Sequence, residues 1–455
     1  MAASWPEYLA AAADAPDLMS ARMQMALSLG WHIVIACFGV GFPAIILIAE
    51  WRGWRRADET YRLLARRWAS VLAVLFAVGA VSGTILSFEL GILWPGLMDR
   101  FGEVIGLPFA IEAIAFFVEA IFIGIYLYGW DKLSPRAHFL SGIPIVVGGI
   151  ASAWFVVTAN AWMNQPRGFE MAGDRLTNVD PWAAILNPAT PVQTTHMILA
   201  AFMVSGFGVA SVYAFALLKG KRDRYHRLGF ILPFAVAALI TPIQIGVGDW
   251  AARFLADNQP AKLAAIEGLY ETTRGAALSI GGIPDGEDLR FAIRIPNALS
   301  LLAQHDPNAE VLGLEEWPPD ERPPVGPVHV AFQVMVAIGL GLLALGAWFA
   351  FVYLRKKQLP GRWFLRAAVA AGPLAAVALE AGWITTEVGR QPWIVYEVMK
   401  VEDAVTHAPN IRFGYYALIL IYIALTIGTI FVLRRLAARP IPEAPAEPAP
   451  MEGLA

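Results

Sequence analysis

Nine long apolar stretches, each about as long as a membrane-crossing helix, constrain this chain more than any other feature of its sequence. A hydrocarbon core of roughly 30 Å is crossed by about 20 apolar helical residues. The composition agrees, because 57% of the 455 residues are hydrophobic and only 16% are charged, against about a quarter charged in a soluble protein. We predict an all-α, polytopic membrane helix bundle. Its nine transmembrane helices are expected near residues 22–49, 69–94, 108–130, 137–162, 192–218, 228–250, 327–354, 364–386 and 411–433.

Basic residues alternate between the connections of the predicted helices, and this alternation predicts the orientation. Cytoplasmic loops of membrane proteins carry an excess of lysine and arginine. Of the 34 such residues here, 21 fall in every second connection or in the C-terminal flank, namely 51–68, 131–136, 219–227, 355–366 and 434–439. We therefore expect the N-terminus outside and the C-terminus inside. The net charge of −3 offers no basic footprint for a nucleic acid.

The predicted organisation has four parts. Residues 1–250 hold the first six transmembrane helices, and residues 327–438 hold the last three. Between them, residues 251–326 are too polar to cross a membrane and are expected to form an extracytoplasmic loop. Residues 439–455, rich in proline, glutamate and alanine, are predicted to be a disordered tail. The sequence has no convincing internal repeat, which disfavours a secondary transporter.

Ionisable residues inside the predicted helices are few, and each is a candidate functional residue because a charge within the bilayer is costly. His32 lies in the first helix and Glu380 in the eighth. Glu112 and Glu119 lie seven residues apart in the third helix, which puts them on one face, roughly 10 Å apart along the axis. Two aligned carboxylates suit a proton relay. A static ion pair is the alternative for the carboxylates, and an interhelical hydrogen bond is the alternative for the histidine.

His196 and Met335 are weak candidates alone but informative together. An interfacial histidine is inexpensive, and a single membrane methionine usually only packs. Histidine with methionine is, however, an established haem ligation. With His32, Glu112 and Glu380, this pair is expected at one depth in the outer half of the membrane, and such a pattern favours a haem site. A zinc or di-iron centre is the alternative, without a Glu-x-x-His motif to support it.

The chain resembles subunit I of the cytochrome bd-type quinol oxidases along nearly its whole length. The resemblance is carried by an ordered series of motifs: MQMALSLGWH, GLPFAIEAIAFFVEAIFIGIYLYGWD, ANAWM, NPATPVQTTHM, KLAAIEGLYET, GGIPD, FQVMVA and EAGWITTEVGRQPW. The compact 251–326 segment resembles that of the short-loop branch, which is often called cyanide-insensitive oxidase.

By this resemblance, the chain would carry three haems. His196 and Met335 would ligate a low-spin haem b. His32 and Glu380 would each be the axial ligand of a high-spin haem. One of these two would be haem b and the other haem d or a third haem b, and the resemblance leaves open which ligand serves which.

The resemblance also implies roles in proton transfer and quinol oxidation. Glu112 would lie beside the oxygen-reducing haem, with Glu119 deeper on the proton route together with Ser152. Lys262 and Glu267 would belong to a quinol-binding loop.

Three further positions stand out against the family pattern. Arg22, and Arg390 of the GRQPW motif, would be candidate propionate or charge partners. Gln333 is a departure, because many members have arginine two residues before the methionine ligand, where its charge would tune the low-spin haem. The two carboxylates of the third helix are also one residue closer together than in many members, although they still share a face.

The implied activity is that of a terminal oxidase. Such an enzyme would oxidise ubiquinol or menaquinol at the outer face and reduce dioxygen to water, generating a proton-motive force without a dedicated pump. It would work in the bacterial cytoplasmic (inner) membrane as a heterodimer with a second polytopic subunit, and with a small single-helix accessory subunit. An ion transporter or channel, or a non-catalytic anchoring subunit, is the alternative, and both predict that no haem is bound.

Overall fold

The computed structural model describes residues 16–173 and 175–440, so most of the predicted disordered tail lies outside the described residues. Within the described part, nine helices are long and apolar enough to cross a membrane, which confirms the predicted number and the all-α class. They are α2 (Pro16–Arg56), α3 (Glu59–Leu93), α4 (Pro95–Gly129), α5 (Pro135–Asn164), α7 (Thr190–Leu218), α8 (Arg224–Asn258), α11 (Val325–Lys356), α12 (Arg362–Val388) and α14 (Ile411–Ala437).

Most of these helices extend beyond the predicted apolar spans, and at some of them a polar capping residue sets the start of the helix. Asp58 begins α3 by accepting a hydrogen bond from the backbone N–H of Thr60 at 3.1 Å. Asp223 begins α8 in the same way, accepting from the N–H of His226 at 3.0 Å. At its other end α8 continues to Asn258, eight residues past the predicted end of the sixth span.

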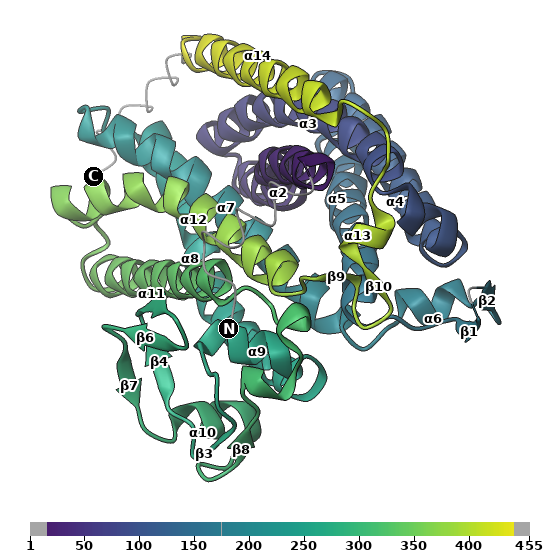
Figure 1. Cartoon of the computed structure of the whole chain (residues 1–455). Coiled ribbons are helices and arrows are strands. Elements are labelled where there is room, and N and C mark those ends of the chain that lie inside the picture. Colours follow the sequence, from purple (N-terminus) through teal and green to yellow (C-terminus); the bar gives the residue numbers. More distant parts are fainter. Residues whose placement is uncertain (1–15, 174, 441–455) are drawn as a thin grey trace, which may run out of the picture.

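Helix α2 lies at the centre of the bundle (Figure 1), where it packs against α3, α5, α7 and α14. Beside it, α7, α8, α11 and α12 form a four-membered ring in which each helix packs against two of the others. The largest buried apolar cluster joins α2 to this ring through residues such as Phe207, Phe234 and Phe364. The residues of α2 and of the ring that belong to this cluster are therefore buried inside the protein.

The segment between α8 and α11 folds over one end of the bundle, which we call the loop end (Figure 1). Its three two-stranded antiparallel sheets pair β3 with β8, β4 with β7 and β5 with β6. Its elements are α9 (Pro260–Glu267), β3 (Thr273–Arg274), β4 (Leu278–Ile280), β5 (Ile283–Asp285), β6 (Asp288–Arg290), β7 (Ile293–Ile295), α10 (Ala298–Gln304), β8 (Glu310–Val311), η1 (Leu314–Glu316) and η2 (Pro319–Glu321).

Two shorter connections complete the loop end. One joins α5 to α7 and the other joins α12 to α14. They comprise β1 (Glu170–Ala172), β2 (Arg175–Thr177) and α6 (Pro181–Ile185), followed later in the chain by β9 (Trp393–Val395), β10 (Met399–Lys400) and α13 (Val401–Ala404). The backbone N–H of Tyr396 donates to the carbonyl of Met163 at 2.9 Å, so the last connection is tied to the end of α5.

Helices α2 and α7 approach each other closely at Gly41. A Cβ atom added there would lie 2.9 Å from the carbonyl oxygen of Ala201 and 2.9 Å from Cα of Phe202. Just beside this point, Ser205 Oγ donates to the carbonyl of Cys37 at 2.7 Å. Small residues permit such backbone contact between membrane helices, so glycine is required at this crossing.

We expect Gly41→Val to lower the free energy of unfolding by about 1–3 kcal/mol, because the added side chain would overlap backbone atoms that cannot move aside. Thermal unfolding of the purified protein in detergent would measure this loss. Gly124→Val is the matched control, since a Cβ atom at Gly124 meets no atom within 4 Å. Equal effects of the two substitutions would contradict the importance of the crossing.

Candidate functional site

The four predicted haem ligands share one local feature, which is a glycine on a neighbouring helix opposite each side chain. A Cβ atom added to the glycine would lie 3.1 to 3.8 Å from the nearest side-chain atom of the ligand. The pairs are His32 with Gly83, His196 with Gly248, Met335 with Gly382 and Glu380 with Gly30. The glycines let a neighbouring helix come close to each candidate ligand, which restricts where the ligand side chain can lie.

His32 contacts the neighbouring helix through one ring nitrogen. Its Nδ1 lies 2.8 Å from Ser82 Oγ on α3. The same hydroxyl lies within hydrogen-bonding distance of the carbonyl oxygens of Val78 and Gly79. A histidine that is oriented through Nδ1 can offer Nε2 as a metal ligand.

Glu380 on α12 carries an unsatisfied oxygen. Its Oε1 is buried and has no hydrogen-bond partner among the described residues. A buried carboxylate oxygen without a partner costs free energy. A ligand bound to this oxygen would remove that cost. Two turns further along, Glu387 differs, because Asn160 and Arg390 donate to its two oxygens.

Two arginines at the loop end present donors without acceptors. Arg22 donates through one NH2 group to Gln391 Oε1 at 2.8 Å, while its buried Nε has no partner among the described residues. Arg390 is likewise buried, with Nε and one NH2 group unpaired. Burial lowers the pKa of Arg390, and Glu387 opposes this effect. Such donors suit the carboxylates of haem propionates.

The two carboxylates of α4 differ in burial, since Glu112 is half-buried and Glu119 is buried, and one of them is bonded by Ser152. Its Oγ donates to Glu112 Oε1 at 3.0 Å, so it belongs with Glu112 and not with Glu119. Glu119 is buried beside Gly149 of α5, whose added Cβ atom would lie 3.4 Å from Oε1. That oxygen has no partner among the described residues, which is consistent with a site that exchanges protons with water.

A second buried polar cluster continues from Glu119 toward the end of the bundle opposite the loop end. Tyr126 follows Glu119 by seven residues on α4, and its hydroxyl donates to Glu50 Oε2 at 2.5 Å. His138 Nδ1 lies 2.7 Å from Glu50 Oε1, and its Nε2 lies 2.9 Å from the carbonyl of Tyr126. Our sequence analysis missed these residues because Glu50 and His138 fall at the margins of predicted spans. The seven-residue spacing could have revealed Tyr126.

The described residues contain no group of three or more His, Cys, Asp or Glu side chains placed to hold a metal ion. The zinc or di-iron alternative would need such a group. It therefore has no support in the described part of the chain.

Lys262 on α9 is buried at the loop end, where its Nζ donates to Asn164 Oδ1 at 2.7 Å. Asn164 Nδ2 donates in turn to the carbonyl of Asn160, and Asn160 donates to Glu387. Burial, and then the charge of Arg390, lower the pKa of Lys262 to about 7, and Glu387 partly offsets them. Our sequence analysis did not single out Asn164 or Glu387, which connect Lys262 to α12.

Glu267, at the end of the same helix, is also buried but has a different environment. Its Oε2 accepts a hydrogen bond from the backbone N–H of Ser279 at 3.3 Å. Burial raises the pKa of Glu267 to about 7, although the Ser279 bond works against this. The two predicted quinol residues thus have separate contacts, Lys262 with the bundle and Glu267 with the loop.

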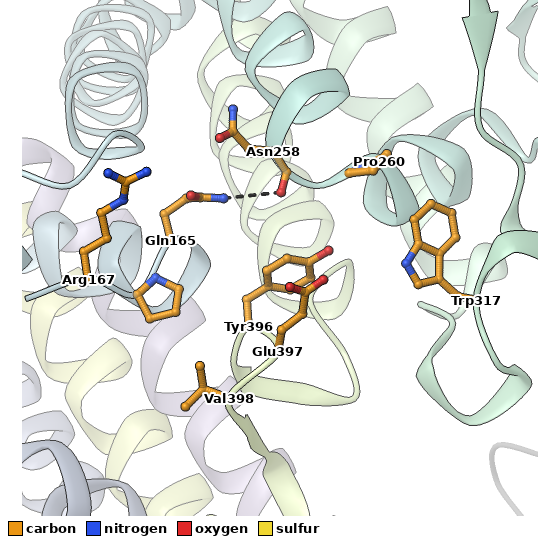
Figure 2. A pocket seen from close by; sticks show the side chains of 9 residues that line it. Gln165, Arg167, Asn258, Pro260, Trp317, Tyr396, Glu397 and Val398 are labelled. Carbon is orange, nitrogen blue, oxygen red and sulfur yellow. Dashed lines mark hydrogen bonds between the residues drawn. The ribbon is translucent and has the colours of Figure 1, made fainter. Parts of the chain in front are cut away.

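A cavity of about 450 Å³ opens at the loop end. Figure 2 shows Gln165, Asn258, Trp317, Tyr396 and Glu397 around it, with Gln165 donating to the carbonyl of Asn258 at 3.3 Å. Trp317, Tyr396 and Glu397 also line a smaller neighbouring cavity that reaches Lys262 and Arg390. The aromatic walls and the buried amine make this region suitable for a ring-shaped ligand with polar substituents.

Comparison with known proteins identifies the family of the chain. The family model for cytochrome bd terminal oxidase subunit I matches residues 20–441. A Bacillus subtilis (strain 168) protein named as subunit I of a cytochrome bd menaquinol oxidase is 38% identical, over 92% of this chain and 96% of the relative. Subunit 1 of a cytochrome bd ubiquinol oxidase from the same strain is 32% identical, over 88% of this chain and 87% of its own.

A solved structure agrees as well. The structure of bd oxidase from Geobacillus thermodenitrificans contains a chain with a TM-score of 0.88 and 42% identity, covering 92% of this chain and 98% of that one. The motifs, the nine helices and the near-complete coverage in both directions therefore lead to one conclusion. This chain is a multi-pass membrane protein that belongs to the cytochrome bd terminal oxidase subunit I family, whose members are quinol oxidases.

Proposed function

We propose that this chain is the haem-bearing catalytic subunit of a terminal oxidase that oxidises quinol at the loop end and reduces dioxygen to water. The observation that carries this proposal is the buried Oε1 of Glu380, which has no hydrogen-bond partner among the described residues. Close packing against a glycine would hold the side chains of His32, His196, Met335 and Glu380 in place. Three bound haems would supply electron transfer and oxygen reduction.

His196 and Met335 would hold the low-spin haem b, since they come from two helices of the same ring. His32 and Glu380 would hold the two high-spin haems, one haem b and the other haem d or haem b. We assign Glu380 and not Glu387 because Asn160 and Arg390 already occupy both oxygens of Glu387. Unpaired donors of Arg22 and Arg390 would bind propionates.

The chain's own residues would carry protons to the site from the end opposite the loop end. His138, Glu50 and Tyr126 would receive them, and Glu119 and then Glu112 with Ser152 would pass them on. We further propose that the loop end faces outward, as the alternation of basic residues predicts. Quinol protons would then be released outside, while protons for water would come from inside. The reaction would generate a proton-motive force without a dedicated pump.

Glu267 would accept a proton from quinol, and Lys262 would orient the quinol head group from the aromatic cavity. The quinol would be menaquinol or ubiquinol, the two substrates named for the relatives. The compact loop would place the chain in the short-loop branch. A second polytopic subunit would form a heterodimer with this chain in the bacterial cytoplasmic membrane. A small single-helix accessory subunit would complete the complex.

Ligand assignment can be tested by absorbance spectroscopy of the purified, dithionite-reduced complex. We expect Met335→Leu to lose the low-spin haem signal selectively, because leucine offers no sulfur to iron. Glu380→Gln should lose one high-spin signal, whereas Glu387→Gln should keep both. The reverse result for the two glutamates would move the ligand to Glu387. A wild-type spectrum with no Soret band would refute the oxidase proposal.

The role of Glu267 predicts a pH dependence. A base accepts a proton only when ionised, and the pKa of Glu267 is raised to about 7 by burial. The kcat/KM for quinol should therefore rise as the pH increases through about 7. Glu267→Gln should abolish this rising limb in oxygen-uptake assays. Persistence of the limb in the variant would assign the proton acceptor to another group.

The proton route predicts that Glu119→Gln slows oxygen reduction by on the order of 100-fold, because an amide cannot pass on a proton. The haem spectrum should remain unchanged, so the loss would lie in proton delivery. Glu103→Gln is the matched control, since Glu103 is an exposed carboxylate on the same helix. A fully active Glu119 variant would rule out this route.

A further inference from the structure

We propose that His329 and Gln333 of α11 form a latch that holds the loop strand β4 and the end of α9 against the bundle, and so position Glu267 for quinol oxidation. The inference rests on the proposed quinol role of Glu267. The two latch residues lie four positions apart, on one face of the first turns of α11. Neither was singled out as a quinol-site residue by the sequence.

The free edge of β4 is the first observation behind the latch. One edge of this strand pairs with β7. Along the other edge, a side chain takes the place of a second neighbouring strand. Gln333 Nε2 donates to the carbonyl of Ser279 at 2.9 Å. Its Oε1 accepts from the N–H of Gly281 at 3.0 Å. A single amide side chain thus binds Ser279 in the strand and Gly281 just after its end, as a neighbouring strand would.

Glu267 and His329 complete the same edge. Glu267 accepts from the N–H of Ser279 at 3.3 Å, and His329 Nε2 lies 3.0 Å from the carbonyl oxygen of Gly281. All four backbone polar groups of Ser279 and Gly281 therefore face one of three side chains. Unpaired strand edges are otherwise exposed to water or to another chain, so this arrangement fixes the strand in one place.

His329 also contacts the residue that precedes Glu267. The ring is fully buried, and its Nδ1 lies 2.6 Å from the carbonyl oxygen of Ile266. Both ring nitrogens therefore face carbonyl oxygens, and both can donate only when the imidazole carries two protons. Glu267 is thus held in place by two indirect contacts. His329 contacts the carbonyl of the preceding residue, Ile266, and Gln333 contacts Ser279, whose N–H donates to the Glu267 carboxylate.

The latch also joins the loop to the helix that carries Met335. Gln333 and Met335 are two residues apart, about 200° around the helix axis, so Gln333 faces the loop while Met335 faces α12. Arginine, which many members of the resembling family have here, can donate to Ser279 but cannot accept from Gly281. In this chain, therefore, Gln333 is a positioning residue for the loop.

The test uses the intact oxidase complex and a short-chain quinol, with oxygen uptake as the assay. We expect Gln333→Met to raise the quinol KM by about tenfold with little change in kcat, because two hydrogen bonds that order the site are lost. Gln333→Glu keeps the acceptor for Gly281 and should raise KM less, and it also serves if the methionine variant fails to assemble. His329→Asn should behave like Gln333→Met. Gln304→Met, at an exposed glutamine of α10, is the matched control.

Hydrogen exchange of residues 278–282 and a haem redox titration complete the test. Faster exchange in the latch variants, with the low-spin haem potential unchanged, supports the latch. A shifted potential with unchanged KM and exchange would mean that Gln333 acts through the haem, and would overturn it. Faster exchange without any change in KM would also overturn its role in positioning. If Glu267→Gln itself leaves KM and the pH profile intact, the proposed quinol role fails instead.

Discussion

The absence of water inside a membrane helix bundle is the constraint on which the rest of this structure depends. Helices satisfy their own backbone groups, so every buried polar side chain needs a partner within the protein or from a ligand. Glu50 finds Tyr126 and His138, and Glu387 finds Asn160 and Arg390. Glu380 does not, because its Oε1 is buried without a partner among the described residues. The oxygens of Glu50 and Glu387 are therefore satisfied within the protein, whereas Oε1 of Glu380 is available to the ligand proposed for it.

Glycine residues at helix contacts are a second feature on which the structure depends. At Gly41 the missing side chain lets two backbones touch, whereas at Gly83 and Gly382 it lets the side chains of His32 and Met335 lie close to the neighbouring helix. The same residue type therefore permits backbone contact at one position and side-chain contact at another.

Hydropathy predicted the nine helices because the thickness of a bilayer sets their length without reference to tertiary contacts. It could not predict contacts made across the chain. Ser152 bonds Glu112 and not Glu119 because of how α4 and α5 pack. Glu50 was overlooked because it follows the end of a predicted span. The partners of Gln333 lie 52 and 54 residues earlier in the sequence, and no local pattern connects them.

The two polar systems lie toward opposite ends of the bundle, and this separation gives the proposed reaction its direction. Lys262 and Glu267 belong to the loop end, whereas Glu50 and His138 lie toward the other. Quinol oxidation and proton uptake would then occur on different sides of the membrane. Each elementary charge would be moved against about 2.3 kcal/mol per 100 mV. Charge separation would thus follow from where the residues lie, without a conformational pump, because the reduction of oxygen would consume the protons that the carboxylates of α4 deliver.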